Sequence, residues 1–236
     1  MCGLNPIRSR FLRGQVQLSG EIIKEMEDEK TRPGTIPLSA KLGFTIWMVF
    51  WVSVVLWAYG PNNFLWLCNL AQFLILYSVW TGNRLILSSQ AGVVFIVGLG
   101  WGLDYGVGLA VSGSVTGLTA YMFDPEIPLL ARATSLYHVL LVPFVLWMCY
   151  RVGYDRRGWV LQCLIGTGAL FASWLLLDPD LNVNWVTHPV GMEQAPLPQP
   201  LYIGMLSIVY PLILYLPGHG LMLAVLSFFK TKRPAA

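Results

Sequence analysis

Two apolar runs joined by a tight turn fill residues 41–84, which read KLGFTIWMVFWVSVVLWAYGPNNFLWLCNLAQFLILYSVWTGNR. The first run covers about residues 42–59 and the second about 64–80. Each is close to the roughly 20 residues that a helix needs to cross a bilayer. The intervening GPNN, residues 60–63, is typical of a turn. The stretch therefore predicts a transmembrane helical hairpin.

Further apolar runs follow this hairpin along the chain. Of the 236 residues, 56% are hydrophobic and only 11% are charged, whereas a soluble domain carries roughly 25% charged residues. Lipid rather than water must therefore cover most of the surface. We predict an all-α membrane protein with six transmembrane helices. The four spans after the hairpin are expected at about residues 85–103, 128–150, 159–177 and 201–229.

The positive charges assign an orientation to these spans. If all six runs cross the membrane, every one of the 15 Lys and Arg residues except Arg132 falls on the same side. The positive-inside rule makes that side the cytoplasm, and both termini are then cytoplasmic. The expected organisation is a cytoplasmic tail with a short amphipathic or polar helix (residues 1–40), a transmembrane domain (41–229) and a basic cytoplasmic tail (230–236).

Residues 105–123 are rich in Gly, Ser and Thr and, after Asp104, carry no charge. A seventh span there would move all later basic loops to the opposite side. Irregular backbone exposed to lipid is also too costly. We therefore expect an external loop that is re-entrant or interfacial.

Polar side chains at membrane depth are candidates for function because they are costly to place there. His138 lies about ten residues into the fourth predicted span, and Cys68 lies at the external start of the second. A thiol activated by an imidazole base is a nucleophile suited to acyl transfer. The structural alternative is a histidine bonded to a backbone carbonyl and a cysteine that only fills space.

Other polar residues gather at the predicted external ends of the spans. We expect Arg132 to pair with one of the external acidic residues, either to anchor a loop or to help bind a headgroup or phosphate. The predicted external polar cluster consists of Asn69, Gln72, Asp104, Arg132, Asn182 and Asn184.

The cofactor, if there is one, is not identified by the sequence. His138 or His219 could each act as a single axial ligand for a haem or a chlorin, but their different depths argue against a shared pair. The four cysteines show no metal-ligand spacing, so no metal site is expected. No nucleic-acid-binding module is present.

Four short segments carry a resemblance to known proteins: Leu67-Cys68-Asn69-Leu70, Ser135-Leu136-Tyr137-His138, Gly153-Tyr154-Asp155-Arg156-Arg157 and Asn182-Val183-Asn184-Trp185. Their order resembles that in uncharacterised small bacterial polytopic membrane proteins. It is distantly similar to the transmembrane phospholipid acyltransferase-like family.

That resemblance implies a bacterial inner-membrane location, with Cys68 as the acyl-carrying nucleophile, His138 as its base and Asn184 as a nearby polar group. The chain departs from the family pattern at Trp66, where a histidine is usual.

Two functional hypotheses therefore remain open, and the sequence does not decide whether the protein is an enzyme. One is a lipid-modifying acyl transfer at an outward-facing Cys68/His138 site. The other is a non-enzymatic accessory or structural subunit of a larger respiratory or photosynthetic membrane complex. The expected partners are membrane lipids and subunits of such a complex, and no nucleic acid.

Overall fold

The computed structural model describes residues 34–231, and these contain helices and no strand. The predicted helix of the N-terminal tail and the last basic residues lie outside this range. Five helical stretches are long and apolar enough to cross a membrane, and the helix Leu67–Thr81 is shorter. The prediction of an all-helical fold with long apolar helices is confirmed for the described residues, and five of these helices could span a membrane. The five long stretches are Leu38–Tyr59, Arg84–Val111, Leu129–Val152, Gly158–Leu176 and Gln199–Phe229.

The helices follow the predicted apolar runs. Glycines with positive φ end two of them: Gly60 (φ 76°) follows α2, and Gly82 (φ 69°) follows α3 in the left-handed region that favours glycine. The α-helices are α2 (Leu38–Tyr59), α3 (Leu67–Thr81), α4 (Arg84–Val111), α5 (Leu129–Thr134), α6 (Tyr137–Val152), α7 (Gly158–Leu176), α8 (Gln199–Tyr210) and α9 (Leu216–Thr231). The short 3₁₀ segments are η1 (Pro61–Leu65), η2 (Ala120–Phe123), η3 (Pro179–Leu181) and η4 (Val183–Trp185), and the π segment is η5 (Pro211–Tyr215).

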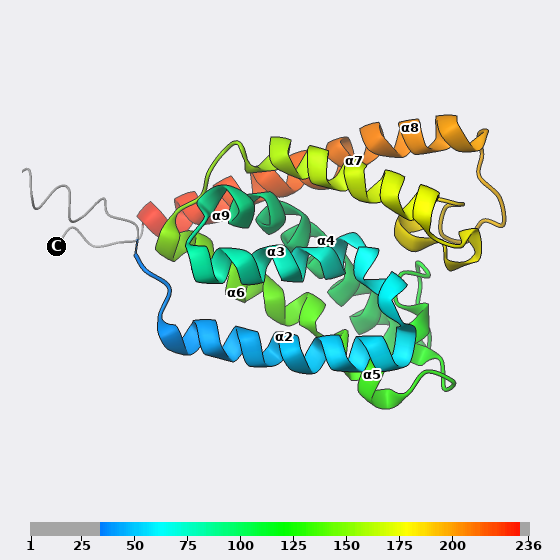
Figure 1. Ribbon diagram of the computed structural model, residues 1–236, viewed down its shortest axis with the longest axis horizontal. Helices are drawn as coiled ribbons and strands as arrows, with labels where there is room; N and C mark the ends of the chain where they lie inside the picture. Colours follow the sequence, from blue (N-terminus) through cyan, green and yellow to red (C-terminus); the bar gives the residue numbers. More distant parts are fainter. Residues whose placement is uncertain (1–33, 232–236) are drawn as a thin grey trace, which may run out of the picture. The chain divides into compact units, whose positions relative to one another are not determined.

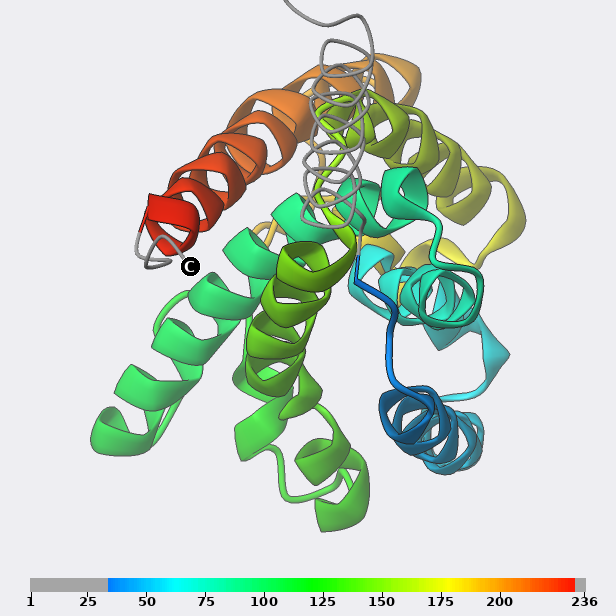
Figure 2. The same cartoon turned by 90° about the vertical axis from the view of Figure 1, so that its left-hand side faces the viewer.

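Helix α4 is central, because it contacts α3, α6, α7 and α9. Figures 1 and 2 show α2 on one side of α4 and α6, and α7 to α9 on the other. The helices run in alternating directions. The turn between α3 and α4 and the connection between α6 and α7 consequently lie at one end, on the left of Figure 1, while the long loops lie at the opposite end.

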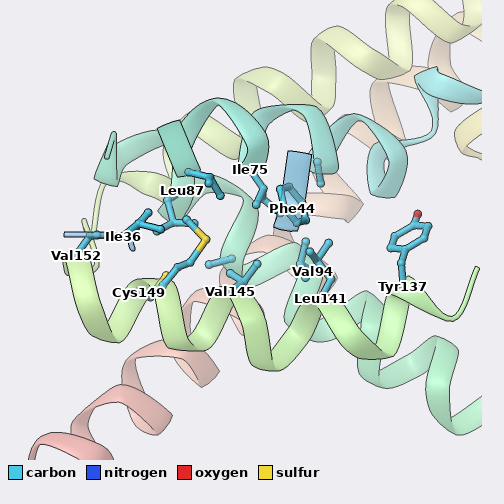
Figure 3. Close-up of a cluster of buried hydrophobic side chains, with 14 of the residues drawn as sticks. Ile36, Phe44, Ile75, Leu87, Val94, Tyr137, Leu141, Val145, Cys149 and Val152 are labelled. Atoms are coloured by element: carbon cyan, nitrogen blue, oxygen red, sulfur yellow. The ribbon is translucent and has the colours of Figure 1, made fainter. Parts of the chain in front are cut away.

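One face of α6 supplies much of the core. Tyr137, Leu141, Val145, Cys149 and Val152 recur every three or four residues and are all buried, and Figure 3 shows them turned toward the neighbouring helices. In lipid, apolar side chains gain little by leaving their solvent, so close packing holds such helices together. Helices α4 and α6 approach closely at Gly98, where an added Cβ atom would collide with the carbonyl oxygen of His138.

Helix α4 extends beyond the predicted end of the third span. We expected the span to close near Asp104, but the helix continues to Val111 and turns at Ser112 (φ 60°). Residues 105–111, predicted as part of a loop, are therefore helical. The remaining loop folds back onto α4, since a Cβ on Gly108 would lie 2.7 Å from Phe123.

The predicted fourth span is broken between α5 and α6. The interruption falls at Ser135 and Leu136, whereas Pro143 lies inside α6. The amide of His138 bonds to the carbonyl of Ser135 three residues back, which marks a tighter 3₁₀ turn. The last apolar run is interrupted by the π segment that begins at Pro211.

Candidate functional site

Asn184 joins three parts of the fold at the end that carries the long loops. Its Oδ1 atom accepts a hydrogen bond from the amide of Leu67 at 2.8 Å, which satisfies one of the free N–H groups at the start of α3. Its Nδ2 donates to the carbonyl of Leu65 at 2.8 Å and to the Ser173 hydroxyl at 3.0 Å. Asn184 thus fastens α3 to α7 and to its own loop.

The neighbouring residues of the Asn182–Trp185 segment strengthen this junction. Asn182, Asn184 and Trp185 all have positive φ, a conformation that asparagine tolerates better than most residues. The carbonyls of Asn184 and Trp185 accept bonds from the hydroxyls of Tyr210 and Tyr202, both at 2.9 Å. The segment therefore fastens α8 as well.

Asn69 is the hydrogen-bonding centre beside Cys68. Its Oδ1 accepts a 2.6 Å bond from the Tyr137 hydroxyl, and its Nδ2 donates to the carbonyl and the side-chain oxygen of Asn63 at 2.8 and 2.7 Å. The half-buried Cys68 thiol faces the same Oδ1 at 3.9 Å. The thiol is therefore a donor to a neutral amide oxygen.

His138 is held in a separate arrangement. Its ring lies between Trp101 and Tyr137, with centroid distances of 5.0 and 4.1 Å. Nδ1 lies 2.8 Å from the Ser135 carbonyl, and because a carbonyl only accepts, Nδ1 carries the proton. This is the carbonyl-bonded histidine that the sequence left open as the structural alternative.

The structure does not join Cys68 to His138 by a hydrogen bond. The thiol bonds to Asn69, and the imidazole bonds to the Ser135 carbonyl. A general base must lie within hydrogen-bond reach of the proton that it removes, directly or through one water. Tyr137 is the residue that links the two, because its hydroxyl reaches Asn69 while its ring stacks on His138.

Asp104 organises the loop that follows α4. The carboxylate accepts bonds from the hydroxyls of Ser114 and Thr119, both at 2.6 Å, and from the amides of Val115, Thr116 and Thr119. A buried charge that accepts several hydrogen bonds is stabilised without a cation. Asp104 therefore fixes the loop, and its oxygens are already occupied.

The rest of the predicted external cluster is dispersed. Gln72 accepts a 2.9 Å bond from the Trp47 indole, and Asn182 holds its own loop through the backbone of Thr187 and His188. Arg132 donates to the carbonyl of Met122 at 2.9 Å. The expected pairing of Arg132 with an acidic residue is not formed within residues 34–231.

A second group of polar side chains lies toward the opposite end, and the sequence analysis did not identify it. Gln90 of α4 donates to Gln162 of α7 at 2.9 Å, and both are buried. Gln162 lines a small hollow together with Ser88 and Tyr215. Single glutamines inside apolar runs were the only available signal, and nothing in their spacing indicated that they pair.

The connection between α6 and α7 is fixed by side chains of the same region. The amide of Asp155 donates to the Ser88 hydroxyl at 2.8 Å, and Tyr154 bonds to Nδ1 of His219 at 2.9 Å. Arg157 forms a 2.8 Å ion pair with Asp155, and these bonds lower the pKa of that carboxyl to about 2. Burial raises the pKa of Tyr154, so its phenol keeps its proton.

The described residues contain no group of three or more His, Cys, Asp or Glu that could hold a metal ion. His138 and His219 each use Nδ1 for an internal hydrogen bond. Nε2 is therefore the atom by which either histidine could ligate a haem or a chlorin. No other feature of the geometry favours a bound haem or chlorin.

Comparison of the chain with protein-family models, with curated proteins and with solved structures gave no match in any of the three.

Proposed function

We propose that the protein crosses the bacterial inner membrane six times, with both termini in the cytoplasm. The support is that the basic connections meet at one end of the helices. Lys41 donates to the carbonyl of Trp80 at 3.4 Å, and Arg151 donates to that of Thr35 at 3.0 Å. A Cβ on Gly153 would lie 3.4 Å from the Arg84 side chain. Positive charge from three connections therefore shares one face.

In this proposal α3 also crosses the membrane, in addition to the five longer stretches. Its 15 residues extend about 22 Å at 1.5 Å per residue, which is less than the roughly 30 Å of the hydrocarbon layer. Segment η1 precedes α3 at the external end and adds to the length of this span. Reporter fusions after Gly60 and after Thr81 test this directly. Opposite locations are expected, and the same location for both would contradict the topology.

We further propose that the protein is a non-enzymatic subunit of a larger membrane assembly. The observation that carries this proposal is an open surface on α4. Leu103 is 69% exposed, and Gly100 and Gly106, one turn before and after it, would have nothing within 4 Å of an added Cβ. A glycine costs about 1 kcal/mol relative to alanine in a helix. Here it gains no contact within the chain, whereas small residues allow a partner helix to approach closely.

The hydrogen bonds of the predicted catalytic residues support the same conclusion. Cys68 and His138 have separate partners, and Asn184 is occupied in joining helix ends. Trp66, which stands where the acyltransferase-like pattern has a histidine, packs edge-to-face against Trp185 at 5.4 Å. These residues serve the packing of the helices.

Gly100→Leu tests the proposal, because it adds a side chain to the open surface of α4 at a position where a Cβ atom would meet nothing within 4 Å. Gly43→Leu is the matched control, since Gly43 of α2 is equally open. After mild solubilisation, the wild type and Gly43→Leu should migrate as a larger assembly, and Gly100→Leu as the free protein. A wild-type protein that purifies as a lone monomer would contradict the proposal.

Acyl transfer at Cys68 is the second candidate. It is favoured by the shared partner Asn69, which connects the thiol to Tyr137 and hence to the His138 ring. The thiol sulfur would attack the ester carbonyl of a phospholipid, and the lysophospholipid alcohol would leave with the thiol proton. In cells fed an alkyne fatty acid, thioester labelling should disappear in Cys68→Ala and persist in the control Cys163→Ala. Unlabelled wild-type protein would exclude this candidate.

A further inference from the structure

Arg132 is a cation that has no carboxylate partner among residues 34–231. It lies in the first turns of the stretch Leu129–Val152, at the end that carries the long loops, and is half-buried. Its Nη1 donates to the Met122 carbonyl, and its Nε is buried without a hydrogen-bond partner. Within residues 34–231 the ion pair that forms is the distant one between Arg157 and Asp155.

Two acidic residues that precede Arg132 in the chain, Asp104 and Asp124, already accept hydrogen bonds from other groups. The oxygens of Asp104 accept the bonds of residues 114–119, and Asp124 accepts a bond from the amide of Glu126. An unpaired charge in a region of low dielectric is costly, and the cost is recovered when an opposite charge binds to it. The guanidinium has five N–H donors and forms one bond to the protein, so it retains donors for an anion.

Tyr59 supplies a second donor to the same place. It ends α2, which packs against α5, and its hydroxyl is buried with no hydrogen-bond partner. Tyr59 and Arg132 lie on these two packed helices, at the end that carries the long loops. Two unsatisfied donors on adjacent helices, one of them charged, form a site at which an anion can accept hydrogen bonds.

The surroundings of this site are apolar. Leu129 and Leu130 of α5 are 73% and 50% exposed, and Leu56 of α2 is 47% exposed. Cationic and hydroxyl donors next to exposed leucines match a molecule that has an anionic group joined to hydrocarbon chains. A free phosphate ion would satisfy the donors but leave the leucines uncovered.

We propose that Arg132 and Tyr59 bind the phosphate of a membrane phospholipid whose acyl chains lie along Leu56, Leu129 and Leu130. The guanidinium fork suits two oxygens of one phosphate, and the bond to Met122 fixes its orientation. This lipid site goes beyond the proposed subunit role and does not depend on it, because a monomer presents the same residues.

Native mass spectrometry of the delipidated full chain tests the site. Phosphatidylglycerol, or diacylglycerol with the same acyl chains, is added back in separate arms, and inorganic phosphate is added as a competitor. One phosphatidylglycerol should bind the wild type, and diacylglycerol should not. Arg132→Gln should lower the bound fraction about tenfold, as expected from loss of a charged hydrogen bond. The control Arg156→Gln, an exposed arginine at the opposite end, should bind as the wild type does.

Equal retention of phosphatidylglycerol by Arg132→Gln and the wild type would overturn the proposal, as would equal binding of diacylglycerol. Displacement by inorganic phosphate at equal concentration would assign the site to a free ion instead. If Arg132→Gln fails to fold, Tyr59→Phe removes the second donor without touching the bond to Met122. It should weaken phosphatidylglycerol binding but leave the thermal midpoint of the lipid-free protein unchanged.

Discussion

Gly98→Ala should destabilise the protein by pushing α4 away from α6. A Cβ at position 98 would collide with the carbonyl oxygen of His138 and would lie 2.5 Å from Cγ2 of Val142. Ordinary contacts begin at about 3.4 Å, so the valine methyl would have to withdraw by roughly 0.9 Å. The valine can rotate, but the carbonyl belongs to the backbone of α6 and can move only with the helix.

Gly100→Ala is the matched control, because it lies two residues further along α4 and would meet nothing within 4 Å. Both substitutions gain the same helix propensity, about 1 kcal/mol. The difference between the two variants therefore isolates the overpacking term, which is about 1–3 kcal/mol for an added methyl group in a packed core.

The assay is thermal unfolding of both variants in the same detergent, followed by tryptophan fluorescence. Trp101 lies near the substitution and stacks on His138, so its emission reports the contact itself. For a chain of this size, about 2–4 °C in midpoint corresponds to each kcal/mol. Gly98→Ala should unfold several degrees below Gly100→Ala. Equal midpoints would refute the close approach of the two helices.

Three further outcomes are expected. Asp104→Asn keeps the shape of the side chain but places an amide donor against hydroxyl and N–H donors. The segment 112–123 should therefore become sensitive to protease, while the spans stay protected. Unchanged protection of this segment would show that the carboxylate is dispensable. Asn184→Ala leaves the buried amide of Leu67 and the part-buried carbonyl of Leu65 unpaired, which should cost about 2–4 kcal/mol of unfolding free energy. Asn184→Asp, which keeps the acceptor, should cost less. The reverse order in denaturant titrations would contradict the assignment. The pKa of Asp155 is depressed to about 2 by Arg157, so the stability from this pair is complete above pH 4 and is lost as the pH falls toward 2. In Arg157→Gln this loss of stability between pH 4 and 2 should disappear. A variant whose stability depends on pH as the wild type's does would argue against the pair.

Much of the fold was predictable because lipid imposes strong rules on a sequence. The spans are long apolar runs. Gly60 and Gly82, which end α2 and α3, both lie between predicted spans. The interruption of the last span at Pro211 was likewise visible, since proline removes a backbone donor. These features depend on composition and local backbone chemistry.

The predicted helix boundaries were wrong where hydrogen bonds formed in the tertiary structure, rather than local sequence signals, decide where a helix ends. Residues 105–111 read as a broken loop, yet they remain helical because Asp104 satisfies the backbone of the segment that follows and lets the chain turn later. The break at Ser135 and Leu136 carried no proline or glycine signal. It is visible only in the 3₁₀ turn and in the second bond that the Ser135 carbonyl accepts from His138.

The class of the protein, its apolar helices and the residues worth testing can be read from the chain alone, because hydropathy and charge act residue by residue. What those residues do depends on how the helices pack. The Cys68 thiol bonds to Asn69, and the His138 ring bonds to the Ser135 carbonyl. Among the described residues, Arg132 has no acidic partner and bonds to the Met122 carbonyl. Hydrogen bonds act over about 3 Å between atoms that are distant in the chain, and no pattern along one chain states which of them meet.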